Sequence, residues 1–111
     1  MGRNTYLELP VTSTARAKAF YEAVLGWTFT DFGPTYASTM AGTGDMGLQA
    51  DASEQSAALL PVIEVADIAM TLAAVEAAGG IVMRPIFAFP GGRRFHFRDP
   101  DGHELAAMQP A

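Results

Sequence analysis

The stretch Tyr6-Leu7-Glu8-Leu9-Pro10 decides the fold, because its pattern returns once further along the chain. It alternates bulky apolar residues with other residues, which is typical of a β-strand, and Pro10 ends the strand. Much later, Ile63-Glu64-Val65 matches Leu7-Glu8-Leu9 in position. We interpret the two stretches as the first strands of an internal repeat.

A helix is predicted after each of these strands. In the first copy a cap at Thr12 or Ser13 precedes apolar residues at helical spacing. Phe20 and Tyr21 fall on this apolar stripe, so we expect both in the core. In the second copy Asp67 can cap the helix, and glycines end both helices.

Further strands follow each helix. They are predicted over residues 27–30, 36–40 and 45–49 in the first copy and 81–83, 95–98 and 103–108 in the second. Residues 50–58 are expected to be a linker, and residues 87–92 a flexible lid. The expected fold class is α+β, with two tandem βαβββ modules (about residues 4–49 and 59–109) forming a curved mixed sheet around a cleft. Neither half alone buries a sheet face well, so residues 1–111 are expected to form a single domain.

Composition narrows the possible partners and locations. The chain has 111 residues, a net charge of −5 and no cysteine. No apolar run approaches the roughly 20 residues that a membrane helix needs. An acidic chain is a poor general partner for nucleic acid, because phosphate binding needs a basic surface. We therefore expect a cytoplasmic protein with no nucleic-acid or membrane partner.

The positive charges are unevenly placed. Arg84, Arg93, Arg94 and Arg98 lie close together in the last third of the chain, with His96 among them. One reading is a solvated hairpin. The other is a basic wall for an anionic or carbonyl-rich ligand.

Three motifs resemble the vicinal oxygen chelate superfamily (glyoxalase, bleomycin resistance protein and dioxygenase-like proteins). The first is the opening strand with residues 16–21 (RAKAFY) and 25–27 (LGW). The others are residues 75–80 (VEAAGG) and 97–103 (FRDPDGH). The resemblance covers nearly the whole chain and implies the repeated βαβββ fold. Fold alone does not choose among the activities of such a family.

The resemblance also implies where metal ligands would stand. Members that are enzymes use His, Gln or Glu on four strands. The matching positions here are Tyr6, near Gly47, Pro61 and near Ala106. Glycine, proline and alanine have no donor side chain, and neutral tyrosine is a poor ligand for a divalent metal. We expect neither a metal nor another cofactor.

Other residues are candidates for chemistry. If Tyr6 faces the cleft, so does Glu8, with Glu64 at the matching position of the second half. Glu8, Glu64 and His96 are the candidate catalytic residues. The alternative is that the two glutamates pair with arginines or strand-end amides and only hold the structure together. Candidate ligand-binding residues are Tyr6, Trp27, Tyr36, Phe87, Phe89, Arg94, Glu104 and Met108.

Two functions remain open, besides a regulatory or purely structural dimer that binds no ligand. The first is a metal-independent small-molecule-binding protein of the bleomycin-resistance type, with its ligand in the cleft or at a dimer interface. The alternative is a lyase or isomerase acting on a small carbonyl compound, with a non-standard metal site or none. The resemblance implies a homodimer in either case.

Overall fold

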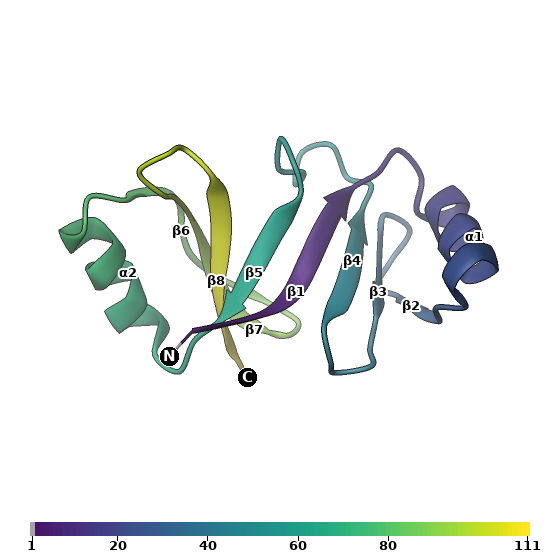
Figure 1. Cartoon of the computed structure of the whole chain (residues 1–111), viewed down its shortest axis with the longest axis horizontal. Coiled ribbons are helices and arrows are strands. Elements are labelled where there is room, and N and C mark those ends of the chain that lie inside the picture. Colours follow the sequence, from purple (N-terminus) through teal and green to yellow (C-terminus); the bar gives the residue numbers. More distant parts are fainter. Residues whose placement is uncertain (1) are drawn as a thin grey trace. The chain divides into compact units, whose positions relative to one another are not determined.

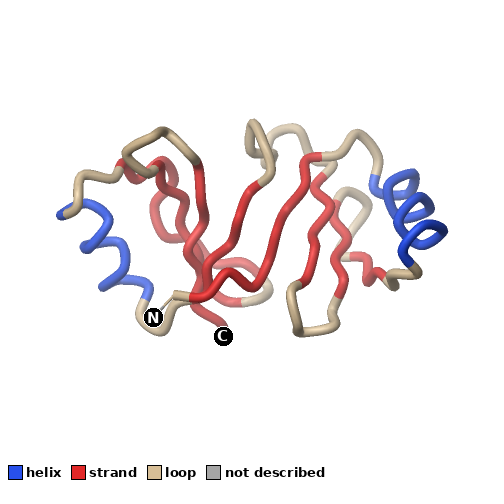
Figure 2. Tube along the Cα trace, viewed as in Figure 1, coloured by secondary structure: helices blue, strands red, loops and turns tan. Residues whose placement is uncertain are grey.

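The computed structural model describes residues 2–111, and these form two compact units. Module 1 is Thr5–Leu60, and module 2 is residues 2–4 with Pro61–Ala111. Each module has the order strand, helix, three strands (Figure 2). The predicted βαβββ repeat is therefore confirmed.

Module 1 is a four-stranded mixed sheet with one helix. Its elements are β1 (Arg3–Pro10, whose first two residues belong to module 2), α1 (Thr14–Leu25), β2 (Phe29–Asp31), β3 (Tyr36–Thr39) and β4 (Asp45–Gln49). The strands lie in the order β2-β3-β4-β1 (Figure 1). β1 is parallel to β4, and the other neighbours are antiparallel.

Module 2 repeats this topology. Its elements are β5 (Leu60–Glu64), α2 (Ile68–Ala77), β6 (Ile81–Phe89), β7 (Gly92–Arg98) and β8 (Glu104–Pro110). The order β5-β8-β7-β6 corresponds strand for strand to β1-β4-β3-β2. The directions correspond as well, since β5 is parallel to β8 and β7 is antiparallel to both of its neighbours.

The predicted helix ends are confirmed. The Ser13 side chain accepts a hydrogen bond from the backbone N–H of Arg16 at 3.2 Å, and the Asp67 side chain accepts one from the N–H of Met70 at 3.0 Å. Gly26 ends α1 with a φ of 69°, which glycine adopts without a steric penalty. Local hydrogen bonding thus fixes where each helix begins and ends.

The core of module 2 lies between α2 and one face of the sheet. Ile68, Phe95 and Ala107 are buried there, and Phe97 packs against them. Because side chains alternate along a strand, Arg94, His96 and Arg98 lie on the opposite face of β7. The sequence alone predicts this arrangement, because period-two alternation that turns Phe95 and Phe97 to the helix-packed core leaves His96 with Arg94 and Arg98 on the other face.

The prediction that Phe20 belongs to the core is wrong. Its side chain is 58% exposed. The side of α1 that is turned to the sheet carries Thr14, Ala17 and Tyr21, which are buried or half-buried. Phe20 lies about 100° further round the helix from its neighbour Tyr21, at the edge of the apolar stripe.

The predicted lid is also wrong. Residues 87–89 belong to β6 and pair with β7, with Phe87 opposite Arg94 and Phe89 opposite Gly92. The register shifts twice between Val82 and Phe87, around Pro85. Proline cannot donate to a strand ladder and is tolerated on an edge strand such as β6. The strand therefore continues through a region where its alternating pattern is broken.

The predicted linker, residues 50–58, contains neither helix nor strand. The Gln55 side chain fastens it to module 1 by donating to the backbone carbonyls of Val11 and Gln49, at 2.7 and 2.8 Å. Among residues 2–111 no helix is both long and apolar enough to span a membrane.

Candidate functional site

A hydrogen-bonded cluster of polar side chains lies on the sheet of module 1. We call Tyr6, Glu8, Tyr36 and Ser38 the tyrosine cluster. The hydroxyls of Tyr6 and Tyr36 are 2.6 Å apart, and the Tyr6 hydroxyl donates to Ser38 Oγ at 2.8 Å. The Tyr36 hydroxyl donates to Glu8 Oε1 at 3.0 Å. Glu8 and Ser38 are 1% and 3% exposed.

The strand register assembles this cluster around a glycine. Gly47 on β4 pairs with Glu8 on β1 and with Ser38 on β3. A Cβ atom at Gly47 would stand 2.2 Å from the Tyr6 hydroxyl oxygen and 2.3 Å from that of Tyr36. Glycine is thus required here because the two tyrosine side chains occupy the space of its missing side chain.

The chemistry of the cluster is that of neutral hydroxyls. Burial, followed by the negative charge of Glu8, raises the pKa of Tyr36 well above its ordinary value. Tyr36 therefore stays protonated at physiological pH and acts as a hydrogen-bond donor. Neutral hydroxyls of this kind suit a carbonyl or hydroxyl group better than a metal cation.

The residues of module 1 do not fit the metal that the fold family implies. The hydroxyls of Tyr6 and Tyr36 occupy the space beside Gly47 that a metal-ligating side chain would need. The nearby carboxylate of β4, Asp45, accepts hydrogen bonds from the N–H groups of Ala41 and Gly42 and from the Thr39 hydroxyl, each at 2.8 Å. Among residues 2–111 no three side chains of His, Cys, Asp or Glu form a group that could hold a metal ion.

The matching position on β5 needs a correction. Val62, not Pro61, pairs with Ala106 of β8 and shares its face of the sheet. Alternation along β5 turns Pro61 to the other face. Valine supplies no donor atom either, so the fit of module 2 to a metal is no better.

In module 2, His96 pairs with Glu104. His96 Nδ1 lies 2.8 Å from Glu104 Oε2, and the histidine is 5% exposed. His96 lies on β7, directly opposite Ala106 of β8. A carboxylate on one ring nitrogen holds the imidazole in one orientation and directs the other nitrogen away from it.

Beside this pair lie two arginines and two aromatic rings, which we call the arginine–aromatic cluster: Arg84, Phe87, Phe89 and Arg94. Arg84 Cζ is 3.7 Å from the centroid of the Phe87 ring. Arg94 Cζ is 5.3 Å from the Phe87 centroid and 5.4 Å from that of Phe89. The Phe87 and His96 rings are 5.9 Å apart. The structure thus brings five predicted site residues together within module 2, namely Phe87, Phe89, Arg94, His96 and Glu104.

Of the remaining predicted site residues, Glu64 and Trp27 have separate surroundings, whereas Met108 borders the arginine–aromatic cluster. Glu64 Oε2 accepts a hydrogen bond from Arg3 Nη2 at 2.9 Å, which is the structural alternative that the sequence left open for this glutamate. Trp27 stacks on Tyr21 with ring centroids 5.4 Å apart. Met108 lies opposite Arg94 in the register of β7 and β8.

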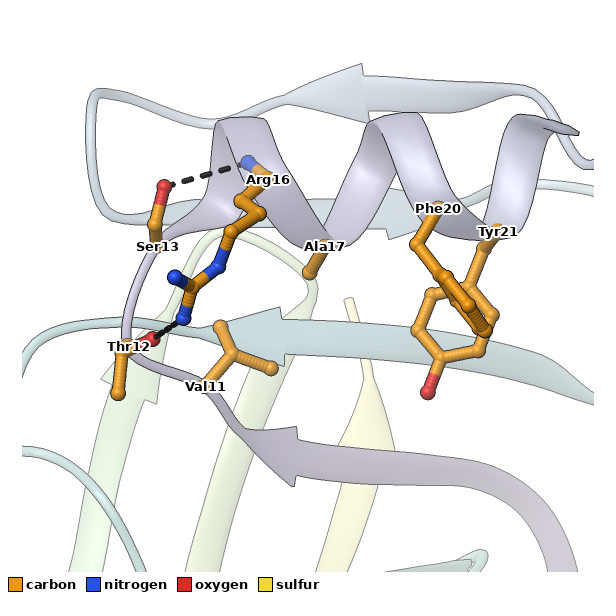
Figure 3. A pocket seen from close by; sticks show the side chains of 7 residues that line it. All are labelled: Val11, Thr12, Ser13, Arg16, Ala17, Phe20 and Tyr21. Atoms are coloured by element: carbon orange, nitrogen blue, oxygen red, sulfur yellow. Dashed lines mark hydrogen bonds between the residues drawn. The ribbon is translucent and has the colours of Figure 1, made fainter.

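Two features were not foreseen. Ser38 joins the tyrosine cluster, and the available signal was its position two residues after Tyr36 on the same face of a strand. The second is a hollow of about 400 Å³ beside α1. Figure 3 shows Arg16, bonded to Thr12, at one end of it and Phe20 with Tyr21 at the other. Its lining is largely apolar, so we assign it no chemistry.

Comparisons with known proteins agree with this fold. The family model described as Glyoxalase/Bleomycin resistance protein/Dioxygenase superfamily matches residues 4–107. No curated protein sequence matches the chain. A hypothetical protein from Bacillus halodurans is similar in structure, with 16% identity, a TM-score of 0.79 and coverage of 99% of this chain and 95% of that one.

Two further solved structures are similar. A glyoxalase/bleomycin resistance protein/dioxygenase superfamily member from Vibrio splendidus has 16% identity and a TM-score of 0.72, covering 96% of this chain and 97% of that one. A Mn(II)-bound glyoxalase from Novosphingobium aromaticivorans has 23% identity and a TM-score of 0.72, covering 98% of this chain and 40% of that one. At such identities the likeness concerns the fold alone.

Proposed function

Since the chain belongs to the Glyoxalase/Bleomycin resistance protein/Dioxygenase superfamily, we propose that it is a small-molecule-binding protein that works without a metal. One observation carries the proposal: two tyrosine hydroxyls fill the space beside Gly47. A metal-ligating side chain at this position would displace both tyrosines. The homodimer and the cytoplasmic location expected from the sequence stay predictions.

The tyrosine cluster supplies the recognition chemistry in this proposal. The half-buried hydroxyls of Tyr6 and Tyr36 are held by Ser38 and Glu8, so their positions are fixed before a ligand arrives. Preorganised groups lose little conformational entropy on binding. Each hydroxyl has one proton, which it donates to Ser38 or Glu8, so a ligand hydroxyl would donate to a tyrosine oxygen and a ligand carbonyl would take the place of one of these acceptors.

A ligand screen by thermal shift tests this function. A ligand that binds the folded state raises the melting temperature by mass action. We expect at least one small carbonyl or hydroxyl compound to do so in the wild type, and Tyr6→Phe to remove most of the shift. Tyr21→Phe is the matched control, because Tyr21 stacks on Trp27 outside the cluster.

The control also supplies the contradicting outcome. If Tyr21→Phe removes the shift while Tyr6→Phe keeps it, the ligand binds beside α1 and the tyrosine cluster is structural. If no compound raises the melting temperature, the chain is not a binding protein of this kind.

A second candidate function is proton-transfer catalysis on a small carbonyl compound. It is favoured by the His96–Glu104 pair, whose 2.8 Å contact orients the imidazole as a general base requires. In that case His96→Ala or Glu8→Gln should abolish turnover while the far-UV circular dichroism spectrum stays unchanged. Wild-type turnover in both variants would end this candidate.

A further inference from the structure

The hairpin formed by β6 and β7 concentrates positive charge. Residues 77–98 contain four of the chain's seven basic residues and none of its twelve acidic ones. The rest of the chain is correspondingly acidic, since the net charge is −5. A local field of this sign attracts anions in spite of the negative net charge.

Two arginines of this hairpin are restrained by aromatic rings. Arg84 stands over Phe87 at 3.7 Å, and Arg94 lies within 5.4 Å of the centroids of both Phe87 and Phe89. When a guanidinium stacks on an aromatic ring, its N–H groups point outward, parallel to the plane of the ring. In that orientation they can donate to two oxygens of a carboxylate or phosphate. Each guanidinium has five N–H donors in a planar fork that can bind two oxygens of one oxyanion at once.

The surroundings of the two arginines include apolar surface as well as the His96–Glu104 pair. Arg94 faces Met108 across β7 and β8, and His96 faces Ala106. Phe87 and Phe89 lie on β6. Their rings are half-buried and lie next to the two arginines. An oxyanion held here would have flat apolar surface beside it, which suits an organic acid better than a bare inorganic ion.

We propose that Arg84 and Arg94 bind the carboxylate or phosphate group of a small organic ligand, with Phe87, Phe89 and Met108 as the apolar wall beside it. The proposal rests on the binding function proposed above, extends it to module 2 and names the chemical class of the group bound there. The ring-stacked arginines act as preformed donors, so the oxyanion adds no large ordering cost when it binds.

Titration calorimetry with three probes of similar shape tests this inference. Benzoate and phenyl phosphate carry the two oxyanions, and benzyl alcohol is the neutral counterpart. All titrations are made at one ionic strength set with sodium chloride, because salt screens exposed charges. We expect at least one of the two anions to bind and benzyl alcohol to bind at least about tenfold more weakly.

Arginine variants locate the binding. Arg84→Gln and Arg94→Gln should each weaken anion binding at least about tenfold, since each removes a charged hydrogen-bond donor. Arg93→Gln is the matched control, because Arg93 lies on the other face of β7 and is exposed. It should change affinity less than about twofold. Arg94→Lys keeps the positive charge but loses the planar fork of N–H donors. Its affinity for the anion should therefore lie between those of wild type and Arg94→Gln.

The outcomes separate this inference from the proposed function. Equal binding of benzyl alcohol and benzoate, or an equal loss in all three glutamine variants, would overturn the oxyanion site and leave the binding function standing. Neutral compounds from the ligand screen that bind while both anions fail would do the same. Failure of every compound would end both proposals.

Discussion

Glu8 and Glu64 occupy matching positions in two modules of the same topology, yet their surroundings differ. Glu8 is 1% exposed and accepts a hydrogen bond from Tyr36. The Glu64 side chain is 31% exposed and pairs with Arg3, whose side chain is 71% exposed. The same residue type is thus part of a buried polar cluster in module 1 and of a surface ion pair in module 2.

This difference teaches that the repeat preserves the backbone and not the chemistry. Strand order and direction agree between the modules. The partner of Glu8 on β4 is Gly47, whereas the partner of Glu64 on β8 is Met108. Gly47 leaves room for the two tyrosine side chains, whereas Met108 brings a side chain of its own to the corresponding register position. Neighbouring side-chain volume therefore decides what each glutamate does.

The largest expected effect is at Gly47. Gly47→Ala should lower the free energy of unfolding by about 3 kcal/mol, because the new methyl group overlaps both tyrosine hydroxyls. Urea denaturation measures the change. In a Tyr6→Phe/Tyr36→Phe background the same substitution should cost at least about 1 kcal/mol less, since the hydroxyls are gone. An equal loss in both backgrounds would mean that the tyrosines do not set the need for glycine.

Replacing the two glutamates compares the modules directly. Glu8→Gln should cost about 2 kcal/mol of unfolding free energy, because a buried charged acceptor is replaced by a neutral one. Glu64→Gln should cost less than about 0.5 kcal/mol, as for other exposed ion pairs. Both values come from urea denaturation at pH 7. Similar costs for the two variants would show that the environments are not energetically different.

The stability at alkaline pH tests the contribution of the buried residue Tyr36. The pKa of Tyr36 is raised in the folded state, so above pH 10 the unfolded chain binds fewer protons than the folded one. Stability must then fall as pH rises, by up to about 1.4 kcal/mol per pH unit from this one group. Tyr36→Phe should lack this part of the slope, and Tyr21→Phe should keep it. Parallel slopes in wild type and Tyr36→Phe between pH 10 and 11 would contradict the account.

The smallest effect is expected at the surface pair. Arg3→Gln should change the free energy of unfolding by less than about 0.5 kcal/mol at low salt. The difference should disappear in 1 M sodium chloride, where charges are screened within about 3 Å. A loss above 1 kcal/mol that persists in salt would give Arg3 a role beyond this ion pair.

Local patterns explain which parts of the fold were predictable. The order of strands and helices along the chain, the caps at Thr12 or Ser13 and at Asp67, and the end of α1 at Gly26 follow from neighbouring residues, and the structure confirms them with Ser13 as the first cap. The length of β6 did not follow, because Pro85 and two register shifts interrupt the alternation that marks a strand. Periodicity placed Phe20 on an apolar stripe but did not tell which part of the stripe meets the sheet.

The sequence identified individual residues of the candidate sites but did not predict which of them lie together. Alternation along β7 put Arg94 and His96 on the face opposite Phe95 and Phe97, as the structure has them. The tyrosine cluster depends on the register of three strands, which the sequence leaves open. From the sequence, Gly47 is therefore interpreted as a metal-ligand position that lacks a donor. Only the strand register shows that Gly47 makes room for Tyr6 and Tyr36.

The most direct test of the central claim is the metal content of protein purified without chelator, measured by inductively coupled plasma mass spectrometry. The measurement is repeated after incubation with zinc, nickel, manganese and iron followed by gel filtration. The account predicts well under one ion per chain in every case, because hydroxyls stand where a ligand side chain would be needed. One firmly held ion per chain would contradict it and give the enzyme candidate the stronger case.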